Sequence, residues 1–130
     1  KTYGLTPSTR GEITRAISDS LAMAYRYYIE RLEVLTGQPV GVIHMVGGGV
    51  HDCFLCQAAA NATGRPVVAG PVEATAIGNI ACQLMALGCF HSVSEARDCI
   101  RRSFPVKVYE PQDRAAWDAA YEQFLTLRGS

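Results

Sequence analysis

Apolar side chains recur every three or four positions along the first part of the chain, which is the spacing of one face of an α-helix. They are Ile13, Ile17, Leu21, Ala24, Tyr28, Leu32 and Leu35. Thr9 and Glu12 have the spacing of a capping box, so we expect the helix to begin after Thr9. Gly37 is expected to end it. Such a helix is about 40 Å long, and we expect one of its ends to lie against something outside this chain.

Three short apolar runs predict strands. Residues 40–46 are β-branched and apolar on both faces, which is typical of a central strand in a parallel sheet. Residues 65–69 form a second short run. Residues 106–109 alternate between polar and apolar side chains, which predicts a more exposed strand. Three strands make a narrow sheet, and together with the first residue, Lys1, this suggests a piece of a longer chain.

Four further helices are expected between and after these runs. One covers residues 51–63 and ends at Gly64, and the next opens with Gly70 and Pro71 and closes at Gly88. Ser92 and Glu95 form a second capping box before a short helix that reaches about Ser103, and Asp113 is expected to cap the last helix. The predicted order is αβαβααβα, an α/β fold with a small, mostly parallel sheet flanked by helices.

Composition and charge narrow the function classes. The chain has 130 residues, which suits one domain, and its formal net charge is +0, which gives no electrostatic reason to expect nucleic acid or a membrane surface as a partner. No apolar run approaches the roughly 18 residues of a membrane span. The five cysteines are an odd number, and three of them lie in apolar helical patterns, as small buried side chains do. We therefore expect a reducing, cytoplasmic setting.

The most informative local pattern is a strand, then Gly47, Gly48 and Gly49, then a helix. Glycines let a ligand approach the backbone, and the start of a helix offers free N–H groups and a positive dipole end to phosphates. Asp52 could accept hydrogen bonds from a ribose or from the amides of its own helix. The alternative is a tight turn without a ligand. The pattern is neither a P-loop nor Gly-x-Gly-x-x-Gly.

Two other groups of residues are weaker candidates for a catalytic, metal or ligand site. Cys53 and Cys56 form a Cys-x-x-Cys pair, but without a second pair we expect packing rather than zinc or redox chemistry. The stretch 70–79 is rich in small residues, which favours close packing of a helix on the sheet through Ala74, Gly78 and Cys82. Its polar members are expected to satisfy helix-end amides; they are Glu73, Thr75 and Asn79. We find no convincing catalytic base or nucleophile in the chain.

Residues 46–79, from the three glycines to Gly70-Pro-Val-Glu-Ala-Thr-Ala-Ile-Gly-Asn79, resemble the C-terminal domain of FGGY-type carbohydrate kinases. The resemblance extends to residues 9–13, 20–27, 102–105 and 109–111. It implies that residues 1–130 are part of an actin-like, RNase H-like C-terminal domain that binds the nucleotide. Gly47, Gly48, Gly49 and Asp52 would then contact ATP, and Mg²⁺ would be held mainly by the nucleotide and the other domain.

The resemblance further implies transfer of the ATP γ-phosphate to a ketose hydroxyl. The sugar pocket and the catalytic base would lie in the other domain, so this piece alone is expected to be inactive. Asp52 departs from the pattern, because the family usually has Asn there, and a carboxylate cannot donate a hydrogen bond. A second hypothesis is a non-enzymatic α/β interaction or oligomerisation module.

Overall fold

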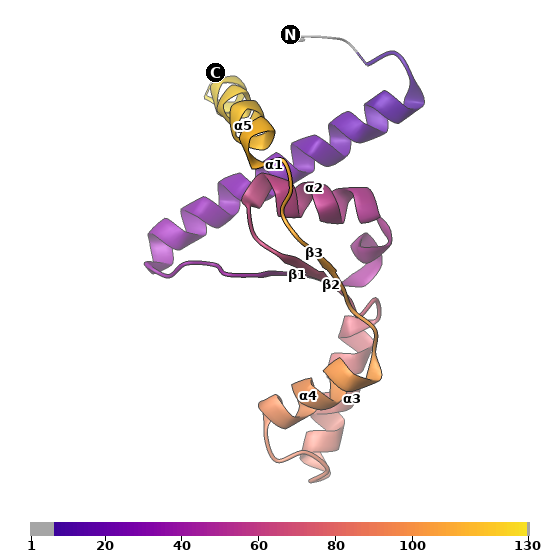
Figure 1. Ribbon diagram of the computed structural model, residues 1–130. Helices are drawn as coiled ribbons and strands as arrows, with labels where there is room; N and C mark the ends of the chain where they lie inside the picture. Colours follow the sequence, from indigo (N-terminus) through magenta and orange to yellow (C-terminus); the bar gives the residue numbers. More distant parts are fainter. Residues whose placement is uncertain (1–6, 130) are drawn as a thin grey trace.

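The computed structural model describes residues 7–129 and confirms the predicted order of elements (Figure 1). In chain order these are α1 (Arg10–Thr36), β1 (Ile43–Met45), the 3₁₀ helix η1 (Gly47–His51), α2 (Cys53–Thr63), β2 (Val67–Ala69), α3 (Ala74–Ala86), α4 (Val93–Ser103), β3 (Lys107–Tyr109) and α5 (Arg114–Arg128). Among the described residues, no helix is both long and apolar enough to cross a membrane.

The ends of α1 are set by local chemistry, as the sequence predicts. The Thr9 side chain accepts a hydrogen bond from the Glu12 amide at 3.2 Å, and the Glu12 carboxylate accepts one from the Thr9 amide at 3.1 Å. Gly37 follows the helix with φ 67°, a left-handed conformation that glycine adopts without strain. The capping box and the glycine stop are therefore both confirmed.

The apolar stripe of α1, by contrast, is not the face that the chain buries. Its members Ile17 and Leu35 are 56% and 84% exposed. The buried residues of α1 are instead Ser18, Ala22 and Met23, which lie where α1 packs against α2. Small side chains permit the close approach of two helices, so this crossing selects a different face from the one with the largest apolar residues.

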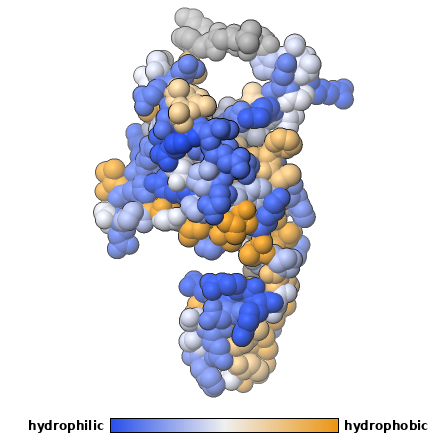
Figure 2. All heavy atoms as spheres, viewed as in Figure 1, coloured by the Kyte–Doolittle hydropathy of each residue, from blue (hydrophilic) through white to orange (hydrophobic). Residues whose placement is uncertain are grey.

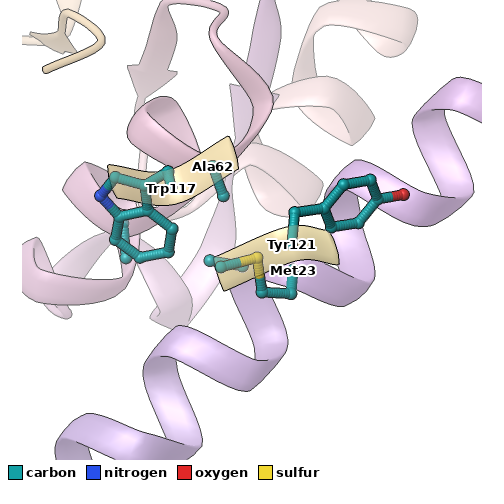
Figure 3. Close-up of a cluster of buried hydrophobic side chains, with 6 residues drawn as sticks. Met23, Ala62, Trp117 and Tyr121 are labelled. Atoms are coloured by element: carbon teal, nitrogen blue, oxygen red, sulfur yellow. The ribbon is translucent and has the colours of Figure 1, made fainter. Parts of the chain in front are cut away.

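Helix α2 lies between α1 and the sheet and connects two clusters of buried side chains (Figure 1). The first joins α1, α2 and α5 through Met23, Ala62, Trp117 and Tyr121 (Figure 3). The second joins α2 to the strands and includes Val67, which is fully buried. Eight residues of α2 are buried, so this alanine-rich helix is the centre of the fold.

Within residues 7–129 the sheet has three strands, in the order β1-β2-β3. β1 runs parallel to β2, with Ile43 opposite Val67, and β3 runs antiparallel to β2, with Tyr109 opposite Val67. Two corrections follow: the sheet is mixed rather than mostly parallel, and the run 40–46 supplies an edge strand while β2 is central. An apolar run indicates that both faces can be buried, but it does not specify how many neighbouring strands pair with it.

Helices α3 and α4 form a lobe that projects away from the sheet (Figures 1 and 2). Within this pair only Ala96 is buried. A Cβ placed on Gly78 would meet no atom within 4 Å. The prediction that Ala74, Gly78 and Cys82 pack closely on the sheet is therefore wrong. The helix also begins at Ala74 rather than directly after Gly70 and Pro71.

Two smaller expectations also need correction. Asp113 occupies the N-cap position of α5, but it has φ 50° and its side chain makes no capping hydrogen bond. Of the five cysteines only Cys56 is buried, whereas Cys82, for example, is exposed on α3. An apolar helical pattern buries a cysteine only where another element covers that face of the helix.

Candidate functional site

The glycine-rich turn connects the end of β1 to the start of α2. Val46 is still extended, with φ −132°, and Gly47 then has φ +76°, which turns the chain into η1. A residue with a side chain is strained in that conformation, so Gly47 is required by the backbone. The turn ends where the Asp52 amide donates to the Gly49 carbonyl at 3.2 Å.

Gly48 and Gly49 are glycines for a different reason. Neither has a positive φ, and a Cβ on either would meet no atom within 4 Å. Both residues are exposed. The fold as described would tolerate a methyl group at these two positions, so what their lack of side chains provides is open backbone beside a helix start.

Asp52 caps α2. Its Oδ1 accepts a hydrogen bond from the Leu55 amide at 2.9 Å, which is the second of the two roles that the sequence left open. The residue is exposed, and it brings a negative charge to the site. Gly47, Gly48, Gly49 and Asp52 thus lie together around the N-terminal end of α2, where the helix dipole favours an anion.

The small-residue stretch that begins at Gly70 lies beside this turn. The Gly70 amide donates to the Met45 carbonyl at 2.9 Å, so the chain leaves β2 next to the point where it leaves β1. The carboxyl ends of both parallel strands therefore lie side by side here. Open α/β sheets bind ligands just beyond the carboxyl ends of their strands. Glu73 precedes α3 but makes no side-chain capping hydrogen bond, so its predicted role at helix-end amides is wrong. The Asn79 side chain accepts from Gln83 within α3, at 3.4 Å.

Sequence reasoning missed Lys107. β3 is antiparallel to β2, so its first residue lies opposite Ala69, at the edge where β1 and β2 end. The Lys107 ammonium lies 4.7 Å from the centre of the Tyr109 ring and is close enough to Cys56 to lower the pKa of that thiol, against a net rise caused mainly by burial. The site therefore includes a cation. The sequence could have placed Lys107 at the site only if the run 106–109 had been predicted to lie antiparallel to β2.

The Cys-x-x-Cys pair begins α2. Cys53 is exposed at the first helical position and Cys56 is buried against β1. Across residues 7–129 no group of three or more His, Cys, Asp or Glu side chains is arranged to hold a metal ion. His44, on β1, and His51, at the end of η1, are both exposed.

The xylulose kinase from Rhodospirillum rubrum has a similar structure, with a TM-score of 0.74 and 22% sequence identity over 98% of this chain and 26% of that chain. This likeness shows that the chain has part of an actin-like fold. The sequence profile of the FGGY family of carbohydrate kinases, C-terminal domain, matches residues 3–87. The chain belongs to this family.

Curated relatives of the chain share one name. It is 51% identical over 118 residues to the rhamnulokinase of Bacteroides thetaiotaomicron, covering 91% of this chain and 24% of that protein. It is 42% identical over 107 residues to the rhamnulokinase of Bacillus subtilis, covering 82% of this chain and 22% of that protein. The chain thus spans about a quarter of the length of the curated relatives it matches.

Proposed function

We propose that this chain is the nucleotide-binding part of an ATP-dependent, rhamnulokinase-like enzyme. The reaction is the transfer of the ATP γ-phosphate to a ketose hydroxyl, with L-rhamnulose converted to L-rhamnulose 1-phosphate. The observation that carries the proposal is the 51% identity to a rhamnulokinase over almost the whole chain. The open backbone of Gly48 and Gly49 at the start of α2 supports it, because it fits a bound phosphate or ribose.

The roles within this part follow from the site. Gly47 sets the turn, and the amides around Gly48 and Gly49 face the nucleotide. Asp52 holds the first turn of α2, and Lys107 offsets its charge beside the phosphates. When bound, Mg²⁺ offsets charge on the phosphates, and it is held mainly by the nucleotide and by the other domain of the enzyme. The described residues contain no metal-binding cluster of their own that would compete with this arrangement.

The chemical step needs groups beyond these. The ketose hydroxyl oxygen attacks the γ-phosphorus, the bond from that phosphorus to the β,γ-bridging oxygen breaks, and ADP leaves. The hydroxyl proton passes to a general base. Phosphoryl transfer depends on positioning and charge stabilisation around both substrates, and we assign the base and the sugar pocket to the other domain. This chain alone therefore has no turnover, and sugar-dependent release of ADP from it would contradict the assignment.

An amide NMR titration with MgADP tests the nucleotide site, with L-rhamnulose as the control ligand. We expect shifts centred on Gly48, Gly49 and Asp52 with MgADP and none with the sugar. Gly49→Ala should weaken binding without unfolding the chain, because its Cβ enters open space. Gly41→Ala is the matched control, since that glycine also has open space around it but precedes β1. Equal affinity in the two variants would exclude the turn as the binding site.

A non-enzymatic interaction module is the second candidate, and the exposed stripe of α1 favours it. Ile13, Ile17 and Leu32 are 47%, 56% and 49% exposed. The stripe shares Tyr28 with an apolar groove between α1 and β1, which Tyr25 and Ile29 also line. Sedimentation tests this candidate: a tight dimer that ignores MgADP and is broken by Ile17→Asp, but not by Leu127→Asp on α5, would favour it.

A further inference from the structure

The first turn of α2 carries two thiols in different surroundings. Cys53 is exposed at the first helical position, and Cys56 is buried one turn later. Residues three apart in an α-helix have Cα atoms about 5 Å apart. Disulfides span Cα separations of roughly 4.4–6.8 Å. The helical backbone therefore places the two Cα atoms at a separation that a disulfide can span.

The buried thiol also contacts the glycine-rich turn. Cys56 Sγ lies 3.4 Å from Met45 Sδ and 3.8 Å from the Gly49 carbonyl oxygen, and its single S–H is the donor that these two acceptors share. A sulfur atom in a disulfide has no hydrogen to donate. Oxidation of Cys56 would therefore remove this donor whatever rotamer the bridged side chain adopts, and the Gly49 carbonyl would then keep only the hydrogen bond from the Asp52 amide, at 3.2 Å.

We propose that Cys53 and Cys56 form a dithiol site that low-molecular-weight disulfides oxidise, and that the resulting bridge loosens the turn at Gly47–Gly49. The consequence for nucleotide affinity rests on the proposed function, whereas the bridge and its effect on the turn do not. The site is a modification site, and it would let thiol oxidation lower nucleotide binding.

The oxidant is a small disulfide of the glutathione class. The Cys53 thiolate attacks one sulfur of the small disulfide, forms a mixed disulfide and releases one small thiolate. Cys56 then attacks the Cys53 sulfur and expels the second small thiolate. Two protein thiols become one disulfide, the small disulfide is reduced to two thiols, and the two cysteine protons end on those thiols.

The order of attack follows from exposure. Burial raises the pKa of the Cys56 thiol, and the Asp52 and Cys53 charges raise it further. Cys53 is the sulfur that a solvent molecule can reach, so it reacts first. Cys56 then resolves the mixed disulfide from within the same turn of helix.

Peptide mapping tests the bridge. The full chain is incubated with oxidised glutathione and digested with chymotrypsin, which cleaves after Phe54, between the two cysteines. We expect the fragments on either side of Phe54 to stay joined until a reductant is added, with a mass two hydrogens below the sum of the separate fragments. Cys82→Ser, which removes an exposed thiol on α3, should behave like the parent chain. Free thiols at Cys53 and Cys56 under these conditions would overturn the proposal.

Amide NMR of the same samples tests the effect on the turn without any nucleotide. Oxidation should shift the Gly48, Gly49 and Asp52 amides of the parent chain but not of Cys53→Ser. MgADP should then bind the oxidised chain about three- to tenfold more weakly, as expected for a lost weak hydrogen bond. A bridge that leaves the Gly49 amide unmoved would overturn the coupling. A chain that shows these shifts on oxidation but binds no MgADP in its reduced form would contradict the proposed function and leave the dithiol site established.

Discussion

The Glu33 carboxylate and the Arg65 guanidinium form a two-point ion pair, with Arg65 Nη2 lying 2.7 Å from both carboxylate oxygens. Both partners also bind the same residue: Glu33 accepts from the Val40 amide at 2.7 Å, and Arg65 Nε donates to the Val40 carbonyl at 2.7 Å. This arrangement ties the end of α1, the chain that leads to β1 and the start of β2 to one another. It fixes where β1 enters the sheet, and thereby where Gly47 leaves it.

Replacing Glu33 by glutamine should lower the melting temperature at neutral pH, because the variant loses the charged half of this pair. The Val40 amide, and after it Arg65, lower the pKa of Glu33 from its ordinary value of 4.5. As the pH falls below that value the unfolded chain takes up a proton before the folded chain does. The stabilisation from Glu33 is therefore complete above pH 4.5 and is lost as the pH falls through the lowered folded value.

Thermal unfolding across the acid range measures this effect. The difference in melting temperature between the parent chain and Glu33→Gln should be largest near neutral pH and should shrink in acid. Glu122→Gln on α5 is the control, since Glu122 is exposed. A difference that stays constant with pH would show that the ion pair adds nothing to stability.

Replacing Tyr121 by phenylalanine should destabilise the fold by about 1–2 kcal/mol, the cost of a lost hydrogen bond to a charged group. The Tyr121 hydroxyl donates to Glu30 Oε2 at 2.7 Å, and the ring stays in the cluster shared by α1, α2 and α5 (Figure 3). Urea unfolding checks the value. Tyr28→Phe removes a solvent-exposed hydrogen bond from Arg128, at 3.1 Å, from a residue that is 58% exposed, and it should change stability by less than about 0.5 kcal/mol.

The raised pKa of Tyr121 also predicts that the folded chain loses stability at alkaline pH. Burial, followed by the hydrogen bond to Glu30, raises the pKa of Tyr121 well above its ordinary value of 10.0. Above pH 10.0 the unfolded chain loses a proton that the folded chain keeps, so rising pH favours unfolding. The stabilisation that the protonated Tyr121 hydroxyl provides is complete below pH 10.0 and is lost as the pH rises above it. Tyr121→Phe should lack this alkaline loss, and an identical alkaline profile in both proteins would argue against the assignment.

Replacing Ala62 by leucine should cost about 1–3 kcal/mol, because a larger side chain forces α1 and α2 apart. Ala22 on α1 and Ala62 on α2 are both fully buried in the same cluster. Ala86→Leu, at the exposed end of α3, is the matched control and should be close to neutral. Urea unfolding of the two variants distinguishes a closely packed crossing from a loose one, which would accept the leucine without loss.

Replacing Asp52 by asparagine should keep the cap on α2, since an amide oxygen can accept from Leu55 as the carboxylate does. MgADP should then bind more tightly, because a negative charge beside the phosphates is removed. Asp52→Ala separates the two effects, as it should cost about 1 kcal/mol of stability through loss of the cap. Calorimetric titration and thermal unfolding give the two values, and weaker binding by Asp52→Asn would mean that the carboxylate itself contacts the ligand.

Replacing Lys107 by glutamine should weaken MgADP binding and reduce its dependence on salt, because a cation leaves the edge where β1 and β2 end. Arg97→Gln on α4 removes the same charge from an exposed position in the projecting lobe and serves as the control. Titrations at low and high ionic strength check the prediction. Equal losses in both variants would indicate only a general effect of net charge.

The candidate site was predictable in part. Gly47, Gly48, Gly49 and Asp52 are contiguous in sequence, so the local pattern identified them, although it left open whether Asp52 caps its helix. The neighbouring groups, Gly70 and Lys107, were not placed there by the sequence, because they reach the site only through strand pairing. The register that sets Ala69 opposite Lys107 depends on hydrogen bonds between distant segments.

What the sequence determined by itself is the order of the elements and most of the helix ends. Thr9 with Glu12, Ser92 with Glu95, Gly37 and Gly64 act through hydrogen bonds and backbone conformations within about one helical turn, so their effect does not depend on distant residues. Tertiary structure alone decided which faces are covered. The large apolar residues of α1 stay exposed and β1 lies at an edge, because burial requires a partner from elsewhere in the chain, and the alanines of α2 offer the closest approach.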